Sequence, residues 1–295
     1  MLRLAAEIDR RDRVLSRVGW LHVALLIAML AAAAFDTRQA LGINIWIKPS
    51  KFAASIAIYV WTLAWLMEYV RGPSWAKGLI RWGVAVAMVV EILCIAGQSL
   101  RGTTSHFNQA TALDTAAFAV MGAMIVFNTL LEGLVLILFL KPYPALPPAY
   151  LLGIRLGLLL ALVSAGVGGM MIGQGAHTVG AADGGPGLPL VNFSTVAGDL
   201  RIAHALGLHA FQILPLAGYL LSRWWSRGTS ILATGAVAAI YAALTAWTLM
   251  TAMEGKPLVG WPAADPAPGD ERAAALVTFR DKASAECGSA AVRAR

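Results

Sequence analysis

Histidines in and beside two polar segments, 101–114 and 173–201, are the residues of this sequence best suited to hold a cofactor. Imidazole nitrogens ligate haem iron and transition metals, and a haem between two helices needs one histidine from each. Four of the five histidines are placed in this way: His106, His177, His204 and His209. We predict that these four line a cofactor site, with a haem or a transition metal as the hypothesised cofactor.

Within this group, His204 and His209 are the first candidates for metal ligands. Their separation of five residues corresponds to about 140° around a helix, so they cannot both bind one ion. Each would need a partner such as His106 or His177 from another part of the chain. The glycines of the preceding apolar stretch would permit close approach of a helix or a flat ligand: Gly166, Gly168 and Gly169.

Two carboxylates interrupt apolar stretches and are candidates for proton transfer. Glu91 lies in VAVAMVVEILCIAGQ, and Glu132 lies in MIVFNTLLEGLVLI one turn after Asn128. An ionised side chain at such a position costs about 2.5–3.5 kcal/mol in a membrane, so it must be paired, protonated or functional. We predict an ion pair between Glu132 and Arg155, while hydrogen bonding for packing alone stays open for both carboxylates.

The stretches that position these residues are long enough to cross a bilayer. Of all residues, 58% are hydrophobic and 13% are charged, and the mean hydropathy is +0.68. Runs of 18 residues or more without period-2 alternation predict membrane-spanning helices. We therefore expect an all-α, polytopic transmembrane helical bundle with seven spans, at 18–35, 52–70, 79–100, 115–140, 150–172, 202–221 and 231–253.

Basic residues predict the orientation of these spans. With segment 1–17 in the cytoplasm, eleven basic residues fall on the cytoplasmic side and six on the other. By the positive-inside rule, the N-terminus is cytoplasmic, the C-terminus is outside, and the protein is a multi-pass protein of the cell inner membrane. The polar tail 254–295 is predicted to be disordered.

The composition also bounds the partners. The net charge of +7 is scattered between apolar runs and not gathered in a stripe, so it indicates topology and no nucleic-acid partner. The lipid bilayer is the expected partner, and a homo-oligomer or a membrane partner subunit stays open. No nucleophile, phosphate-binding or dinucleotide-binding motif is present in the sequence, which leaves open whether the protein is an enzyme.

Three segments carry a resemblance: KPSKFAAS, SHFNQATALD and GDLRIAHALGLHAFQILPL. With these, residues 17–253 resemble uncharacterised multi-pass bacterial inner-membrane proteins, and this resemblance implies no activity. In architecture alone, the chain is also similar to membrane b-type cytochromes and haem A synthases. Their ligand histidines do not match this chain helix by helix, so no functional residue is carried over.

These observations leave three functions open. The first is a membrane redox protein or enzyme that binds haem or another metal near the outward face through histidines. The second is a proton-coupled or small-solute transporter that uses the mid-membrane carboxylates. The third is a non-catalytic membrane subunit or sensor.

Overall fold

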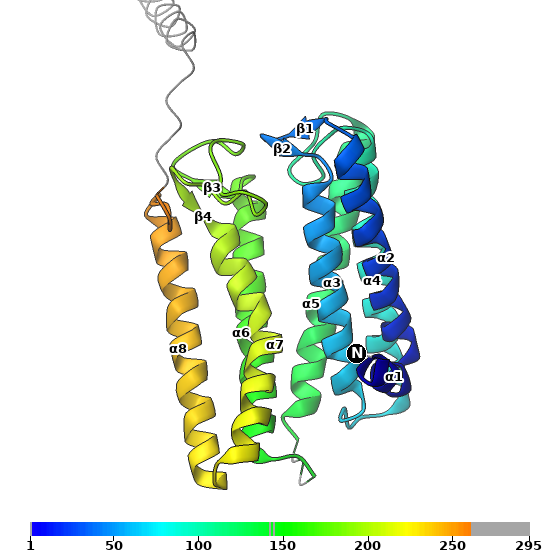
Figure 1. The fold of residues 1–295 in the computed structure, drawn as a ribbon, viewed down its shortest axis with the longest axis vertical. Helices are drawn as coiled ribbons and strands as arrows, with labels where there is room; N and C mark the ends of the chain where they lie inside the picture. The colour runs from blue at the N-terminus through cyan, green and yellow to red at the C-terminus, as the bar shows by residue number, and fades with distance from the viewer. Residues whose placement is uncertain (1, 142, 144, 261–295) are drawn as a thin grey trace, which may run out of the picture. The chain divides into compact units, whose positions relative to one another are not determined.

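Long helices make up most of the chain (Figure 1). The computed structural model describes residues 2–141, 143 and 145–260, and the predicted tail 254–295 lies almost wholly outside them. Within the described residues, the helices are α1 (Leu2–Arg11), α2 (Arg13–Phe35), α3 (Ile47–Met67), α4 (Ser74–Leu100), α5 (Ala112–Phe139), α6 (Pro148–Gln174), α7 (Leu200–Trp224) and α8 (Arg227–Met253).

Helices α2 to α8 overlap the seven expected spans and confirm the all-α class. Each is long and apolar enough to cross a membrane, and the chain is an integral membrane protein of the multi-pass type. Several helices begin earlier than expected, because a polar residue caps the first turn. Asp199 caps α7 by accepting a hydrogen bond from Arg201 N at 3.0 Å. Thr111 caps α5 in the same manner.

Met1–Val259 form one compact unit, in which α1 to α5 gather on one side and α6 to α8 on the other (Figure 1). The main core lies among α3, α4 and α5 and receives the inner faces of α6 and α7. Phe139, Ile154 and Phe211 are among its fully buried side chains. The two groups meet along α5 and α6, and also where α3 touches α7.

Helices α6 and α7 form the most extensive helix pair, and glycines make it possible. A Cβ at Gly157 would lie 2.7 Å from the carbonyl oxygen of Ala210, and a Cβ at Gly153 would collide with the carbonyl of Leu214. Small residues at such contacts let two helix backbones approach closely in a membrane. By contrast, Gly166 has no neighbour that a Cβ would meet.

Short strands and loops cover one end of the unit, which we call the loop end. The strands β1 (Gln39–Ala40) and β2 (Ile43–Asn44) form one hairpin. The strands β3 (Thr178–Val179) and β4 (Gly198–Asp199) pair antiparallel, which ties the long α6–α7 connection to the start of α7. The opposite end, which carries α1, is the α1 end (Figure 1).

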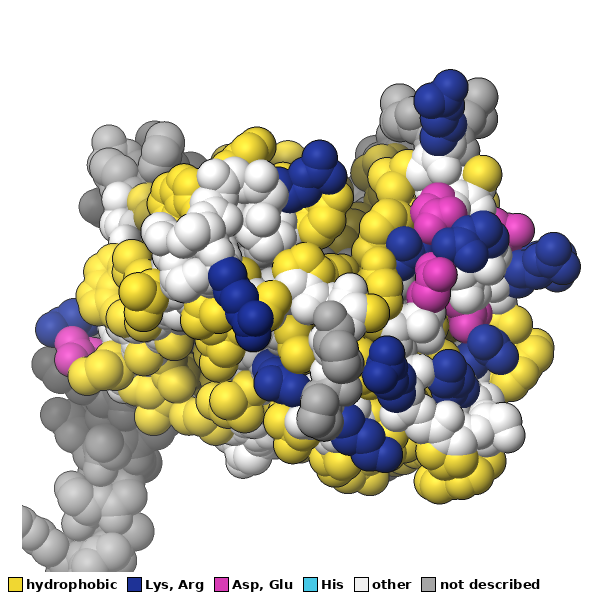
Figure 2. All heavy atoms as spheres, turned by 90° about the horizontal axis from the view of Figure 1, so that it is seen from below, with side chains coloured by type: hydrophobic (Ala, Val, Ile, Leu, Met, Phe, Trp, Pro, Cys, Tyr) yellow, Lys and Arg dark blue, Asp and Glu magenta, His cyan; other side chains and the backbone are white. Residues whose placement is uncertain are grey.

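Charged side chains at the α1 end hold α1 against the spans. Glu7 accepts hydrogen bonds from Arg10 and Arg11, each at 2.8 Å, and Glu68 at the end of α3 accepts one from Arg10 at 2.9 Å. Figure 2 shows this end, with Lys and Arg side chains distributed over it and Asp and Glu side chains gathered in one part. This excess of basic residues is the feature from which we predict a cytoplasmic location.

Candidate functional site

Four segments that are distant in sequence bring polar side chains together at the loop end. The first turn of α3 contributes two lysines, the α4–α5 loop one histidine, the α6–α7 connection a histidine and a carboxylate, and the start of α7 an arginine and a histidine. We call these residues the loop-end cluster: Lys48, Lys51, His106, His177, Asp183, Arg201 and His204.

Asp183 organises the loop that follows α6. Its Oδ2 lies 2.6 Å from His177 Nδ1, and its carboxylate also accepts the backbone N–H groups of His177 and Thr178 and the Thr178 hydroxyl. Burial alone would raise the pKa of Asp183, but these hydrogen bonds hold it well below its usual range. Burial lowers the pKa of His177 despite the carboxylate. At neutral pH, His177 is therefore neutral and donates Nδ1–H to Asp183, which leaves Nε2 free to accept.

His106 has the opposite arrangement of its ring nitrogens. Its Nδ1 lies 3.2 Å from Lys48 Nζ and 3.0 Å from Ser105 Oγ. When Lys48 is an ammonium group it can only donate, and Nδ1 then accepts while Nε2 carries the proton of the neutral ring. Burial, followed by the charge of Lys48, lowers the pKa of His106 well below its ordinary value. The ring lies among aromatic side chains, with the Phe52 centroid at 5.7 Å and the Phe107 centroid at 6.2 Å.

The two candidate metal ligands of α7 separate. His204 Nδ1 lies 2.8 Å from the carbonyl oxygen of Ser164 on α6, so Nδ1–H donates and Nε2 stays available. His204 is within electrostatic reach of His106 and His177. His209 instead bonds along its own helix, to Gln212 Oε1 at 3.2 Å. Among the described residues, no three histidine, cysteine or carboxylate side chains stand close enough to hold one metal ion.

Three cations of the cluster interact with one another across two helices. Arg201 is paired with Asp199, whose Oδ1 lies 2.9 Å from Arg201 Nε. Lys51 donates to the carbonyl oxygen of Val191 at 2.8 Å, and Lys48 donates to His106. Within the described part of the chain, neither lysine has a carboxylate partner, although both lie within electrostatic reach of Arg201.

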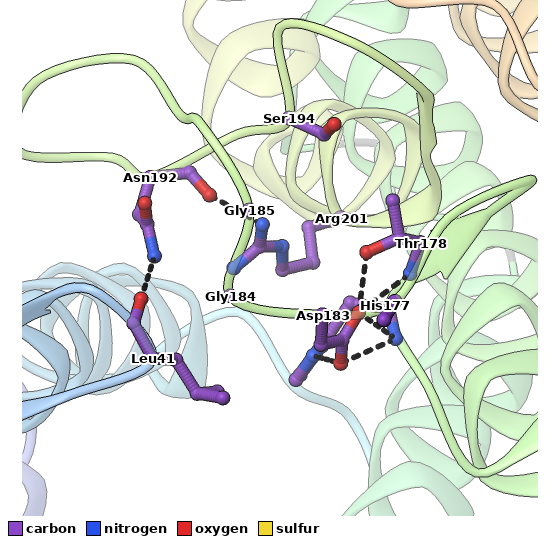
Figure 3. Close-up of a pocket in the computed structure, with 10 residues that line it drawn as sticks. Leu41, His177, Thr178, Asp183, Gly184, Gly185, Asn192, Ser194 and Arg201 are labelled. Carbon is purple, nitrogen blue, oxygen red and sulfur yellow. Dashed lines mark hydrogen bonds and ion pairs between the residues drawn. The ribbon is translucent and has the colours of Figure 1, made fainter. Parts of the chain in front are cut away.

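A small polar pocket opens beside these cations (Figure 3). Its cavity volume is about 20 Å³, room for about one water molecule. Arg201 extends into it, with Asn192 on one side, Gly184 and Gly185 across from its guanidinium, and Asp183 on the other side. Asn192 Nδ2 also donates to the carbonyl oxygen of Leu41 at 3.2 Å, so the pocket joins the β1–β2 hairpin to the α6–α7 connection.

Glu91 lies beneath this cluster in the middle of α4. Its side chain is 4% exposed, and its Oε2 has no hydrogen-bond partner among the described residues. The charge of Lys48 acts on it. A buried polar atom without a partner is uncommon in a folded protein and requires an explanation. Glu91 therefore connects the loop-end cluster to the interior of the span.

Glu132 occupies a second buried polar position. It is 7% exposed and lies one turn from Asn128 on α5. Tyr59 of α3 donates to Asn128 Oδ1 at 3.1 Å, and its ring packs against Phe211 of α7 at 5.8 Å between centroids. This polar group therefore lies where α3, α5 and α7 meet.

The predicted ion pair between Glu132 and Arg155 is replaced by another arrangement. Arg155 Nε donates to the carbonyl oxygen of Phe139 at 2.8 Å, and Nη2 donates to those of Leu140 and Lys141 at 3.2 and 3.0 Å. These carbonyl groups lie at the end of α5, where no backbone N–H of the helix donates to them. The guanidinium donates to them instead, and its charge also stabilises the negative end of the helix dipole. Arg155 thus stabilises the α5 terminus.

Comparisons of the chain with protein-family models, with curated proteins and with solved structures found no match.

Sequence reasoning missed Asp183 as a functional residue. One signal was available, because Asp183 is the only carboxylate between Glu132 and Asp199 and follows His177 by six residues. The importance of Ser164 could not be read from its side chain, since it is the main-chain carbonyl that positions His204.

Proposed function

We propose that this integral membrane protein is a proton-coupled transporter of a small solute, with Glu91 as the proton carrier and the loop-end cluster as the solute entrance. The single observation that carries the proposal is the buried, unpartnered Oε2 of Glu91. A carboxylate in mid-span costs about 2.5–3.5 kcal/mol, which favours a group that takes up a proton or meets a charged solute.

Lys48 supports this proposal because it lies between the two parts of the site. Its charge acts on Glu91 below it, and its Nζ is 3.2 Å from His106 above it. A solute that binds Lys48 would change the electrostatic field at Glu91 and thereby its affinity for a proton. Binding and protonation linked in this way are the thermodynamic basis of coupling.

Glu132 is a second proton-transfer candidate in the proposal. Tyr59 and Asn128 form a hydrogen-bonded pair beside it, where α3 and α5 face α7. Relative movement of α1–α5 against α6–α8 would alter this contact, so we assign Glu132 to the path beyond Glu91. The proposal retains the predicted inner-membrane location, with the N-terminus and α1 end in the cytoplasm and the loop end outside.

A flux experiment tests the proposal. The purified chain is reconstituted into liposomes that contain a pH indicator, and inward gradients of small carboxylates, phosphate, amino acids and amines are imposed one at a time. We expect one of these classes to drive proton movement with the wild-type protein. Glu91→Gln should abolish this movement, whereas Glu254→Gln, which changes an exposed carboxylate at the same end, should preserve it.

Retained folding is checked by the elution profile of each variant before reconstitution. Proton flux that is unchanged by both Glu91→Gln and Glu132→Gln would exclude these carboxylates as carriers. Solute flux without any proton movement would contradict coupling and leave only facilitated transport.

A second candidate function, a membrane redox protein that binds haem or another metal, is favoured by the ring orientation of two histidines. His177 donates Nδ1–H to a carboxylate and His204 donates Nδ1–H to a carbonyl, which leaves both Nε2 atoms available. Metal-binding histidines usually have this kind of outer partner. When bound, the group would supply electron transfer.

An absorption spectrum with metal analysis of the purified protein tests this second candidate. A haem would give a Soret band at one equivalent per chain, lost in His204→Ala and kept in His209→Ala. A sample with neither a Soret band nor stoichiometric metal, prepared from cells supplied with both, would reject it.

A further inference from the structure

We infer that the loop-end cluster binds the oxyanion group of a ligand, a phosphate or a carboxylate, through Lys48, Lys51 and Arg201. This inference names a substrate class for the transport site and in that sense rests on the proposed function. Binding can nevertheless be measured without transport, so the two can fail separately.

The lysines have hydrogen-bonding capacity that the described residues do not use. Each ammonium group has three N–H donors. Lys48 uses one donor on His106, and Lys51 uses one on the carbonyl oxygen of Val191. Arg201 Nε and Nη2 are occupied by Asp199 and Asn192, while its Nη1 forms no hydrogen bond in the described part of the chain. An oxyanion accepts several such donors at once.

The charges around the site leave an excess of cations. Asp199 is committed to Arg201, and Asp183 is committed to His177 and Thr178. The histidines add no positive charge at neutral pH, since burial lowers the pKa of both His106 and His177. Glu91 and Asp183 are carboxylates whose charges act on Lys48. When Glu91 is protonated, as a proton carrier must be in part of its cycle, the three cations Lys48, Lys51 and Arg201 face the two carboxylates Asp183 and Asp199, which leaves one net positive charge.

Half-buried ammonium groups without anions are costly, because they lose hydration without gaining a charge partner. Lys48 and Lys51 are both partly enclosed, and the carbonyl oxygen of Val191 lies against the Lys51 ammonium. An oxyanion bound there would offset this cost. We therefore expect the anion to bind most tightly when Glu91 is protonated, which gives anion and proton the same direction of movement.

The oxyanion site lies where the charged ends of Lys51 and Arg201 approach each other, since they donate to the neighbouring carbonyl oxygens of Val191 and Asn192. Neither lysine lines the pocket, which borders this site on the side of Arg201. Arg201 extends into the pocket, and Asn192, which follows the Lys51 acceptor Val191, forms part of its wall (Figure 3). Its cavity volume of about 20 Å³ admits one small polar group, so the rest of a ligand must lie outside the pocket. The backbone of Gly184 and Gly185 lines another side of the pocket, and the side chain of Leu41 lies next to Gly184.

The oxyanion can belong to a free solute or to the head group of a lipid, and the experiment separates these sources. The full chain is placed in nanodiscs of phosphatidylcholine, and the binding of sodium phosphate and of sodium succinate is measured by calorimetry. The same titrations are repeated in nanodiscs that also contain phosphatidylglycerol, and retained lipids are identified by native mass spectrometry.

We expect phosphate or succinate to bind the wild-type protein in phosphatidylcholine nanodiscs. Lys48→Gln and Lys51→Gln should each weaken this binding about 10- to 100-fold, the range for loss of one hydrogen bond to a charged group. Lys256→Gln removes a lysine that is paired with Glu254 at the same end and should leave binding unchanged. If Lys48→Gln does not fold, Lys51→Gln alone decides, because its ammonium bonds only to a loop carbonyl.

A lipid source would appear as phosphatidylglycerol retained by the wild-type protein, lost in Lys51→Gln, and competing with free phosphate. A free solute as the source would leave phosphate or succinate binding unaffected by phosphatidylglycerol. The absence of both free-anion binding and lipid retention, or equal binding by wild type and both lysine variants, would overturn the inference. Oxyanion binding without flux that depends on Glu91 would instead overturn the proposed function and leave this site standing.

Discussion

Replacement of Asp183 should open the connection between α6 and α7 locally, because this carboxylate is the acceptor for four donors. Two donors belong to His177, its backbone N–H and its ring Nδ1–H, and two belong to Thr178, its backbone N–H and its hydroxyl. At about 1 kcal/mol net for each hydrogen bond, Asp183→Ala removes about 4 kcal/mol from the stability of the loop. We use this modest value because the carboxylate is partly exposed and its interactions are screened.

Asp183→Asn separates the role of the charge from that of shape. The amide oxygen of asparagine can keep the two donors of Thr178, while its NH₂ group faces the donors of His177. The expected loss is therefore about half that of Asp183→Ala, or about 2 kcal/mol. Since 1.36 kcal/mol corresponds to a factor of ten, local opening should increase about 30-fold for Asp183→Asn and about 1,000-fold for Asp183→Ala.

Hydrogen–deuterium exchange measures this opening directly, because the amides of His177 and Thr178 are themselves donors to Asp183. The peptide 175–185 should exchange faster in both variants, in the order Ala over Asn over wild type. Asp36→Ala is the matched control, since Asp36 holds Arg38 and Trp46 in another loop at the same end. Exchange in 175–185 that is the same in wild type and Asp183→Ala would refute the reasoning.

The remaining predictions concern pH, packing and a helix terminus. The pKa of His106 is lowered by burial, so the unfolded chain binds a proton that the folded chain excludes. The contribution of neutral His106 to the free energy of unfolding is fully present above the ordinary histidine pKa of about 6.5. It is lost as the pH falls, by at most about 1.4 kcal/mol per pH unit. His106→Gln should therefore make thermal unfolding less dependent on pH. Gly157→Ala should destabilise by about 1–3 kcal/mol, because its Cβ meets the α7 backbone, whereas Gly166→Ala on the same helix should be neutral or slightly stabilising in the same assay. Arg155→Gln should lower stability by about 1–3 kcal/mol, because the hydrogen bonds to the α5 carbonyls are lost. Its effect should add to that of Glu132→Gln, because the two side chains do not form an ion pair. A coupling energy well above about 0.5 kcal/mol in the double mutant would instead support that ion pair.

The spans could be predicted because the length of an apolar run is a local property of sequence. The ends of these helices could be predicted less well from the sequence. Helix α3 begins at Ile47 and not near Phe52, since Pro49 fits a first helical turn and Lys48 and Lys51 can extend into a polar cluster. Reading hydropathy alone places such lysines outside the span, although their side chains contact residues of two distant loops.

Helix faces could not be predicted where both faces are apolar. Gly157 and Gly166 occupy similar sequence surroundings in α6, yet only Gly157 contacts α7. In a soluble helix, the polar face would reveal the buried side. A span surrounded by lipid has no such contrast, so the contact face follows only from the partner helix. Of the three glycines at which close approach was predicted, Gly168 lies against His204 of α7, where a Cβ would be 3.1 Å from His204 Cε1, whereas Gly166 and Gly169 have no such neighbour.

The partners of charged groups were predicted from proximity along neighbouring spans, and this reasoning ignored the main chain. Arg155 bonds three carbonyls at the end of α5, and His204 bonds a carbonyl of α6. Every residue has a main-chain carbonyl group, so the sequence does not show which carbonyl accepts a hydrogen bond from a side chain. A side-chain pair such as His177 with Asp183 can be predicted from sequence, but only if a rare carboxylate in a glycine-rich segment is treated as informative.

These differences place the chemistry of the protein at the few buried polar groups whose hydrogen bonding is incomplete within the described residues. His22 has the polar character of the loop-end histidines, yet its ring contacts the carbonyl oxygens of Val18 and Met88 at 2.7 and 3.3 Å and is completely buried. A neutral ring has one N–H and donates it to one of these carbonyl oxygens, and the complete burial of the ring leaves no access for a ligand. Glu91 has an unpartnered oxygen, and Lys48 above it has unused donors. Since folding alone does not satisfy these two groups, a proton and an anion that bind between them would complete the hydrogen bonding that the protein itself leaves open.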